Sequence, residues 1–152
     1  MKQDSIIAVT PDTFEKCGNI WDIRQEHIFV NYCLDTLKKG ERATFAFLHE
    51  NAFIGEISLV FDRNDSTLTV PGKRIYLSRL LVKKEFRHNG VGTALLLHAC
   101  EYAKGLCYSE ASLGVNLQNF AALRLYWKCG FTSIVSVDED PFGPYLILLK
   151  LL

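Results

Sequence analysis

The sequence predicts a single α/β domain, residues 1–152, in which a mixed β-sheet carries helices on both faces. Short apolar runs recur along the chain, some alternating with polar residues, as β-strands do. Between them lie segments whose apolar residues repeat every three or four positions, as in amphipathic helices. The 152 residues, 49% of them hydrophobic and 22% charged, are enough for one domain with a substantial core.

The expected elements follow one another without an internal repeat or a linker. Strands are expected at residues 6–9, 43–48, 53–61, 74–82, 111–115, 131–137 and 144–151, and helices at 12–22, 26–38, 91–104 and 119–129. Gly40, Gly105 and Gly130 stand where these helices should stop, and glycine readily adopts the left-handed cap conformation. Residues 49–52 have the length and polarity of a hairpin connection.

Charge and cysteine content exclude several classes of protein. Seventeen Lys and Arg residues balance seventeen Asp and Glu residues, which argues against binding to nucleic acid through bulk electrostatics. Neither a signal peptide nor an apolar run of membrane-spanning length is present, so we expect a cytoplasmic protein without a membrane partner. The five cysteines are odd in number and include no C-x-x-C pair, so we expect reduced thiols that lie mostly in the core, and no metal site.

A glycine turn, Arg87-His88-Asn89-Gly90-Val91-Gly92, stands between the expected strand 74–82 and the helix that follows. Such a turn aims free backbone N–H groups and the positive end of a helix dipole at one point, where a diphosphate would bind. A Cβ at Gly90 or Gly92 would stand between the peptide and the phosphate oxygens. The alternative is a plain strand-to-helix turn whose glycines serve backbone geometry alone. The dinucleotide fingerprint and the Walker phosphate loop are both excluded, because the segment lacks the third glycine of the first and the G-x-x-x-x-G-K-S/T pattern of the second.

Two other segments of the sequence add to the evidence from the glycine turn. Apolar Leu80-Leu81-Val82 precedes it, and a segment from Asn119 to Phe131 follows later in the chain. With these segments the sequence resembles the GCN5-related N-acetyltransferase (GNAT) superfamily, whose coenzyme A signature Q/R-x-x-G-x-G/A is matched at every specified position by residues 87–92. The resemblance implies a mixed, mostly antiparallel sheet of about seven strands, splayed between the fourth and fifth strands and flanked by about four helices.

The same resemblance implies acetyl-CoA as co-substrate and a set of residues that hold it. Backbone groups near a bulge in the fourth strand would bind the pantetheine arm, and the turn would bind the diphosphate. The matching positions are Leu80, Leu81 and Val82 for the arm, and Arg87, His88, Asn89, Gly90, Val91, Gly92 and Thr93 for the diphosphate.

Asn119 and Tyr126 form a second candidate group, because seven residues are almost two helical turns and place both on one helix face. Asn119 can cap the helix, contact the cofactor, or do both, and Asn116 can bond the pantetheine amides or shape a turn. By resemblance, Tyr126 protonates the departing thiolate, and the alternative is a structural tyrosine. Phe120, Leu123 and Trp127 lie on a neighbouring face and are expected in the core.

The implied reaction is direct attack of an amine on the acetyl thioester in a ternary complex, without an acyl-enzyme. The stretch 74–80, where related enzymes often place a glutamate, holds no carboxylate. Glu56 is therefore the candidate base, directly or through a water ordered by Ser78 or Tyr76, and its alternative is a solvated strand position. The N–H of Leu81 or Val82 is the candidate donor to the oxyanion.

The sequence leaves the acceptor, a primary amine of a small molecule or peptide, unidentified. We expect the helices between 12 and 38, the loop 62–73 and the connection 138–143 to select it. Trp21, Phe29 and Tyr32 either line an acceptor pocket or belong to the core, and Asp138-Glu139-Asp140 either attracts a cationic amine or is merely solvated. A transferase for a longer acyl-CoA, a non-catalytic acyl-CoA sensor and a homodimer are left open.

Overall fold

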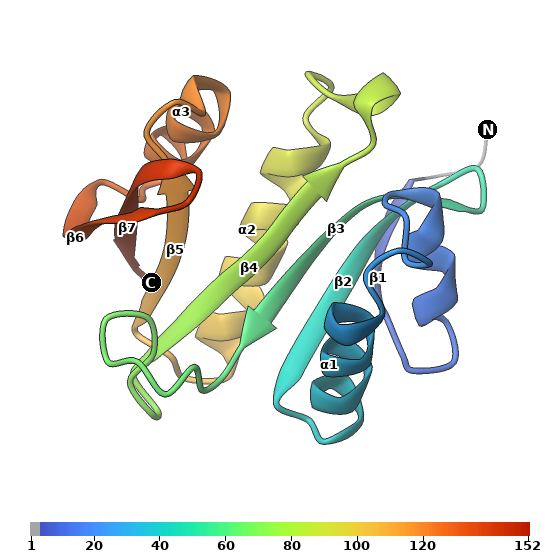
Figure 1. The fold of residues 1–152 in the computed structure, drawn as a ribbon, viewed down its shortest axis with the longest axis horizontal. Helices are drawn as coiled ribbons and strands as arrows, with labels where there is room; N and C mark the ends of the chain where they lie inside the picture. The colour runs from blue at the N-terminus through green and yellow to red at the C-terminus, as the bar shows by residue number, and fades with distance from the viewer. Residues whose placement is uncertain (1–3) are drawn as a thin grey trace. The chain divides into compact units, whose positions relative to one another are not determined.

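The computed structural model describes residues 4–152, whose strands form a seven-stranded sheet in the order β1-β2-β3-β4-β5-β7-β6 (Figure 1). The strands are β1 (Ser5–Ala8), β2 (Arg42–His49), β3 (Ala52–Val60), β4 (Arg74–Val82), β5 (Glu110–Asn116), β6 (Ser133–Asp140) and β7 (Gly143–Leu151). The α-helices are α1 (His27–Lys38), α2 (Val91–Gly105) and α3 (Phe120–Lys128), and the 3₁₀ helices are η1 (Phe14–Asn19) and η2 (Lys84–Phe86).

The sheet is mixed, as the sequence predicted. β4 and β5 pair in parallel over Arg74–Tyr76 and Glu110–Ser112, whereas β1 with β2, β5 with β7, and β6 with β7 are antiparallel. The parallel ladder is short, and β4 continues beyond it to Val82. Within β4, Arg79 has a φ of +57°, a left-handed conformation that interrupts the regular strand just before the predicted pantetheine-binding segment.

By its internal contacts the chain divides into two compact units. The first holds residues up to Leu59 together with Arg79–Ala99, and the second holds Val60–Ser78 and Cys100–Leu152. Consequently β3, β4 and α2 each contribute residues to both units.

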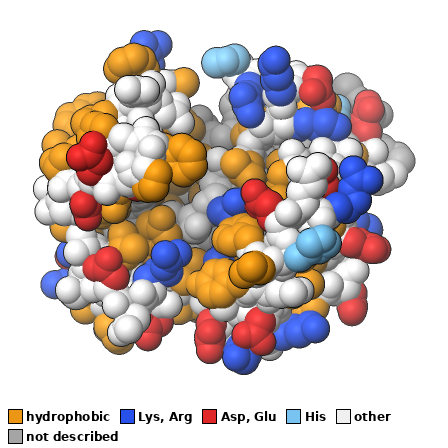
Figure 2. Space-filling model, viewed as in Figure 1, with side chains coloured by type: hydrophobic (Ala, Val, Ile, Leu, Met, Phe, Trp, Pro, Cys, Tyr) orange, Lys and Arg blue, Asp and Glu red, His pale blue; other side chains and the backbone are white. Residues whose placement is uncertain are grey.

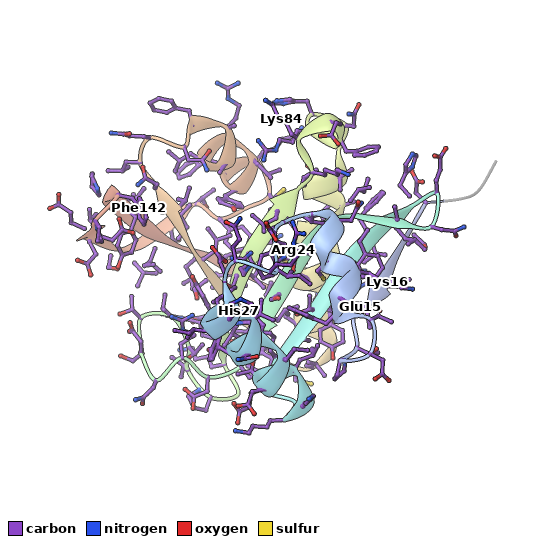
Figure 3. The ribbon with its side chains drawn as sticks, turned by 45° about the vertical axis from the view of Figure 1, so that its right-hand side comes forward. Glu15, Lys16, Arg24, His27, Lys84 and Phe142 are labelled. Carbon is purple, nitrogen blue, oxygen red and sulfur yellow. The ribbon has the colours of Figure 1, made fainter. Side chains whose placement is uncertain are left out.

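The core of the first unit lies between its strands and the η1–α1 segment. Buried residues from β2, β3, η1 and α1 meet there, and in Figure 3 the helices carrying the labelled Glu15 and His27 lie over one face of the strands. α2 lies behind the strands in Figure 1, and His98 packs edge-on against Phe45 of β2, 4.6 Å between ring centroids. The buried cluster comprises Val9, Phe14, Cys17, Cys33, Ala46 and Phe53.

The expected helix at residues 12–22 is wrong in type, because this segment forms only the six-residue 3₁₀ helix η1. Its two buried side chains, Phe14 and Cys17, are three residues apart. A repeat of three residues places side chains directly above one another in a 3₁₀ helix, so the spacing suits this helix as well as an α-helix.

β3 is buried on both faces along nearly its whole length. It follows a two-residue hairpin turn in which Glu50 and Asn51 both have positive φ, 49° and 66°, as a type I′ turn requires. Close approach explains Gly55, where a Cβ would lie 3.0 Å from Leu95 Cδ1 and 3.1 Å from Leu81 O. A larger side chain at this position would push β4 or α2 away from β3.

In the second unit, β5, β7 and β6 pair in antiparallel fashion, and the register of β6 shifts between Ile134 and Ser136. β6 begins and ends later than expected, because Asp138, Glu139 and Asp140 pair with Tyr145, Pro144 and Gly143 of β7. The acidic run therefore belongs to the strand, and only Pro141 and Phe142 remain as the connection.

Two further expectations about the helices of this unit are wrong. Phe120 and Trp127 are 71% and 57% exposed rather than core residues, because the short helix α3 buries none of its residues completely. Its half-buried positions are Ala122, Leu123, Leu125 and Tyr126. Gly105 lies within α2, and Cys107 takes the left-handed conformation that ends the helix, at φ +69°. Gly130, at φ +98°, ends α3 as predicted.

Candidate functional site

The turn between η2 and α2 presents a run of unbonded backbone N–H groups. Helical hydrogen bonding begins with the Ala94 N–H, which donates to Gly90 O at 3.0 Å. The N–H groups of residues 88–93 donate to no other group among the residues that the structure describes. His88 and Gly90, at φ +65° and +83°, flank Asn89, and this alternation turns successive N–H groups toward a common point. The arrangement fits an anion with several oxygens.

Arg87 and Asn89 hold the turn in shape. The Arg87 Nε donates to the carbonyl of Val82 at 3.0 Å and ties the turn to the end of β4. The Asn89 side-chain amide donates to the carbonyl of Arg87, also at 3.0 Å. Both side chains were predicted to bind the diphosphate, and the structure gives them an additional role in fixing the loop.

Positive charge gathers around this turn. Lys83, Lys84 and Arg87 fall within five consecutive residues, with His88 next to them, and Figure 2 shows blue and pale blue side chains clustered over η2 and the turn, at the top of the view. One carboxylate, Glu85, is close to Lys83 at 3.8 Å. The excess of cations adds to the partial positive charge of the α2 N-terminus and favours an anionic ligand.

The strand end before the turn, Leu80 to Val82, is packed against β3. The Lys83 N–H donates to Ile54 O at 2.7 Å, and Leu81 O faces the position where Gly55 lacks a side chain. The side chains of all three residues are half-buried. Binding of a pantetheine arm by their backbone groups stays a prediction.

Glu56, the candidate base, is buried in the first unit with 2% of its surface exposed. Its Oε1 accepts a hydrogen bond from the Trp21 indole N–H. Burial raises the pKa of Glu56 to about 7, against the opposing effects of the Arg79 guanidinium, the Trp21 hydrogen bond and the Arg42 guanidinium. The interpretation of Glu56 as a solvated strand residue is therefore wrong, because β3 is covered on both faces. A carboxyl with this pKa can accept a proton near neutral pH.

Asn116 and Asn119 lie in the second unit and are both engaged in local hydrogen bonds. Asn116, at the end of β5, donates to Phe142 O at 3.2 Å and accepts from the Gln118 N–H at 2.9 Å. Asn119 caps α3, as one of its predicted roles required, by accepting from the Ala122 N–H at 3.2 Å. Contact of either residue with a cofactor stays a prediction.

Tyr126 lies half-buried on α3, with its ring edge-on to Phe131 at 6.3 Å between centroids. Its hydroxyl makes no hydrogen bond with any residue from 4 to 152. Burial, with a smaller effect from Tyr76, raises the pKa of Tyr126 to about 12. The phenol therefore keeps its proton at neutral pH and has a donor available for a ligand.

A cavity of about 380 Å³ opens in the second unit beside Tyr76. The guanidinium of Arg63 lies over the Tyr76 ring, 5.3 Å from its centroid, and Asp65, Asp138 and Asp140 supply acidic groups to the lining. The cavity thus draws on two of the segments, 62–73 and 138–143, that were expected to select the acceptor.

The structure distributes the predicted site residues between the two units. Glu56, residues 80–82 and residues 87–93 belong to the first, and Ser78, Asn116, Asn119 and Tyr126 to the second. Ser78 is half-buried on β4, and its hydroxyl makes no hydrogen bond within the described part of the chain.

Arg79 is a site residue that the sequence did not single out. Its guanidinium lies over the rings of Trp21 and Phe29 and acts electrostatically on Glu56. One signal was present, because Arg79 is the only charged residue in the run from 75 to 82.

The described residues, 4–152, hold neither a membrane-spanning helix nor a cluster of metal ligands. None of the helices there has the length and apolar character needed to cross a bilayer. No three His, Cys, Asp or Glu side chains in this range come together as metal ligands.

Comparison with known families decides the classification. The family model described as "Acetyltransferase (GNAT) family" matches residues 7–131, most of the chain. The chain belongs to this family. The GNAT match includes β4, the turn, α2 and all of α3, so the segments that carried the resemblance lie within it.

Individual relatives are distant. Probable N-acetyltransferase san of Drosophila melanogaster is 26% identical over 110 residues, which are 72% of this chain and 56% of that protein, so the chain spans little more than half of its length. Among solved structures, the IAA acetyltransferase from Bacillus cereus ATCC 14579 aligns with a TM-score of 0.76 at 22% identity, over 99% of this chain and 100% of that one. A GNAT family acetyltransferase from Elizabethkingia anophelis, solved with acetyl-CoA bound, aligns with a TM-score of 0.74 at 18% identity over 100% of both chains. At these identities the likeness shows the GNAT fold.

Proposed function

We propose that this chain is an N-acetyltransferase that moves the acetyl group of acetyl-CoA to a primary amine of a small molecule or peptide. The observation that carries the proposal is the run of six N–H groups at residues 88–93, which are set among basic side chains and donate to no group in residues 4–152. It provides what a diphosphate needs, and a GNAT structure of the same fold was solved with acetyl-CoA bound.

The residues of the turn fit coenzyme A by their chemistry. The N–H groups of residues 88–93 would donate to the diphosphate oxygens, and space lies open in front of Gly90, where a Cβ would meet nothing within 4 Å. The backbone of Leu80, Leu81 and Val82 would hold the pantetheine arm. Bound acetyl-CoA would supply the thioester from which the acetyl group is transferred.

Glu56 is proposed as the general base. Its pKa of about 7 leaves most molecules ionised at about pH 8, so the carboxylate can take the proton that the amine loses. It acts directly or through a water, for which Ser78 is the proposed positioning group. The new bond joins the amine nitrogen to the acetyl carbon, while the N–H of Leu81 or Val82 donates to the carbonyl oxygen.

Tyr126 is proposed as the general acid. As the carbon–sulfur bond breaks, the phenol donates its proton to the leaving sulfur and later regains one from solvent. The raised pKa, about 12, keeps Tyr126 protonated across the working pH range, and its unbonded hydroxyl is free to reach a ligand.

The test is a panel of primary amines incubated with acetyl-CoA, with release of free thiol measured and products identified by mass spectrometry. We expect acetylated product from at least one amine, and none from the Gly90→Arg variant. Acetyl-CoA binding without turnover of any amine would contradict the proposal and favour an acyl-CoA sensor. Turnover only with longer acyl-CoA thioesters would contradict the choice of donor.

A further inference from the structure

The guanidinium of Arg79 is stacked on two aromatic rings but makes no hydrogen bond with any described residue. It lies 4.4 Å from the ring centroid of Trp21 and 4.5 Å from that of Phe29. Its Nε is buried without an acceptor, and no carboxylate among residues 4–152 lies within ion-pair distance of it. A buried guanidinium normally satisfies its N–H groups, so an unmet donor at this position calls for an explanation.

Arg42, on the neighbouring part of the same unit, repeats the pattern. It is 4% exposed, its Nε donates to Thr36 Oγ1 at 3.1 Å, and its guanidinium lies 5.4 Å from the Tyr32 ring centroid. One of its terminal nitrogens is buried without an acceptor. Two arginines of the first unit thus have unmet donors.

Both guanidiniums act on the Glu56 carboxylate and lower its pKa, against the larger opposing effect of burial. Even so, the only hydrogen bond that Glu56 accepts from a described residue comes from Trp21. Glu56 and Arg79 both contact Trp21, whose indole N–H donates to the Glu56 carboxylate and whose ring lies beneath the Arg79 guanidinium, so the two opposite charges face the same side chain. The backbone of Arg79 is strained as well, at φ +57°, and such strain is concentrated at functional sites.

A ligand that carries both a positive and a negative charge would pair with both Glu56 and Arg79. Its ammonium group would face the Glu56 carboxylate, and its own carboxylate would accept from the Arg79 fork, a geometry that suits guanidinium. Trp21, Phe29 and Arg79 are half-buried, so a ligand can reach the Arg79 side of this group of residues. Arg42 is enclosed, and its charge balances that of Glu56.

We propose that the acceptor of this enzyme is an amine that carries a carboxylate near the amino group, of the amino-acid class, and that Arg79 binds this carboxylate. The proposal rests on the proposed acetyltransferase function. In this proposal the acceptor amine binds at Glu56, and the rings of Trp21 and Phe29 pack against the Arg79 guanidinium and hold it in place. The competing acceptor class is a diamine, which would suit the acidic cavity of the second unit instead.

The first experiment varies the acceptor and leaves the protein unchanged. L-leucine, L-leucinamide, 3-methylbutylamine and 1,4-diaminobutane are compared by kcat/KM from thiol release. We expect L-leucine to exceed the two leucine analogues that lack the carboxylate by about 10- to 100-fold. The amide has the more weakly basic amine and thus more of the reactive neutral form, so simple amine reactivity would give the opposite order.

The second experiment removes the proposed carboxylate partner. In Arg79→Gln, the kcat/KM for L-leucine divided by that for L-leucinamide should fall towards one, because the KM for L-leucine rises. Arg79→Lys should retain part of the preference for L-leucine. The ratio is the readout because loss of Arg79 also raises the pKa of Glu56 and slows every acceptor. Arg124→Gln, which removes an exposed arginine of α3, should leave the ratio unchanged.

The outcomes separate this proposal from the one on which it rests. Turnover of 1,4-diaminobutane or L-leucinamide in preference to L-leucine would overturn the carboxylate site and leave the acetyltransferase function standing. Failure of every amine, with acetyl-CoA still bound, would overturn the function itself. An unchanged ratio in folded Arg79→Gln would overturn the role of Arg79, and the acceptor series in the wild-type protein decides the substrate class if that variant does not fold.

Discussion

Replacing the buried Glu56 by glutamine should stabilise the protein at alkaline pH while abolishing its activity. Glutamine has nearly the shape of glutamate, and its amide oxygen can still accept the Trp21 hydrogen bond. It never ionises, so Glu56→Gln removes the net energetic penalty of the buried charge, which remains after the opposing effects of Arg79, Trp21 and Arg42. The free energies of unfolding of the two proteins should therefore differ only at pH values at which Glu56 ionises in the unfolded chain or in the folded protein.

The size of the effect follows from the pKa of Glu56, which rises from its ordinary value of 4.5 to about 7 on folding. The folded protein binds this proton more tightly than the unfolded chain, so the stabilisation is complete below about pH 4.5 and is lost as pH rises through about 7. At about 1.4 kcal/mol for each pH unit, the loss reaches about 3 kcal/mol. Relative to the wild type, Glu56→Gln should therefore gain about 1 kcal/mol at about pH 5 and about 3 kcal/mol at about pH 8.

Urea unfolding followed by far-UV circular dichroism at these two pH values measures the difference. Equal m-values for the two proteins would show that the midpoint shift reports stability alone. Glu101→Gln, which changes an exposed glutamate on α2, is the matched control and should show no pH-dependent gain. Turnover of Glu56→Gln should fall by about 100-fold or more if this residue is the base.

Equal gains at the two pH values would refute the buried-charge reasoning, and so would a wild-type protein that is more stable than Glu56→Gln at about pH 8. Full activity combined with the expected stability gain would leave the electrostatics intact but remove Glu56 from catalysis. Active sites commonly contain groups that lower the stability of the protein because their ionisation is needed for activity.

Four other substitutions test separate parts of the structure. Tyr126→Phe should lower kcat by about 10- to 100-fold and change the calorimetric Kd for acetyl-CoA little, because only the donated proton is lost; wild-type kcat at several pH values would exclude Tyr126 as the acid. Gly90→Arg should abolish acetyl-CoA binding, and an unchanged Kd would contradict the diphosphate site. Gly55→Val should cost about 1–3 kcal/mol, since a Cβ would lie 3.0 Å from Leu95 Cδ1, and an unchanged Tm would contradict that packing. Asn119→Ala should cost about 1 kcal/mol through the lost cap, and an unchanged urea midpoint would show that the cap contributes nothing.

The element order and the glycine turn could be predicted because both depend on local properties of the chain. Strands and helices repeat their side chains with different periods, and a turn that needs positive φ favours glycine at that position. Gly90 has that conformation, at φ +83°. His88, at φ +65°, could not be predicted in the same way, because most residues avoid this region and nothing local signals when tertiary structure imposes it.

The sequence predictions of helix type and of core residues in α3 were wrong where one hydrophobic pattern fits two different local structures. Phe14 and Cys17 lie three residues apart, a spacing that both a 3₁₀ and an α-helix can bury. In α3, apolar residues stand on both sides of a helix of nine residues, so hydrophobicity did not indicate which side faces the sheet. Phe120 and Trp127 proved exposed for this reason.

The surroundings of Glu56 depend on contacts between distant parts of the sequence. Trp21 is 35 residues away from it and Arg79 is 23 residues away. No local pattern predicts that Trp21 bonds to Glu56 or that Arg79 acts on its charge. The alternating strand pattern was misleading as well, because β3 is covered on both faces and its polar positions are buried with the apolar ones.

This difference explains why the donor could be inferred from sequence and the acceptor could not. Residues 88–93 would bind the donor through backbone N–H groups, so the recognition depends on chain conformation, which local signals reveal. Recognition of the acceptor by Glu56 and Arg79 would depend on side-chain charges that only tertiary packing brings into range. Varying the charges of the acceptor one at a time therefore tests that packing directly, and the ratio between an amino acid and its amide is the quantity that separates a guanidinium site from an acidic one.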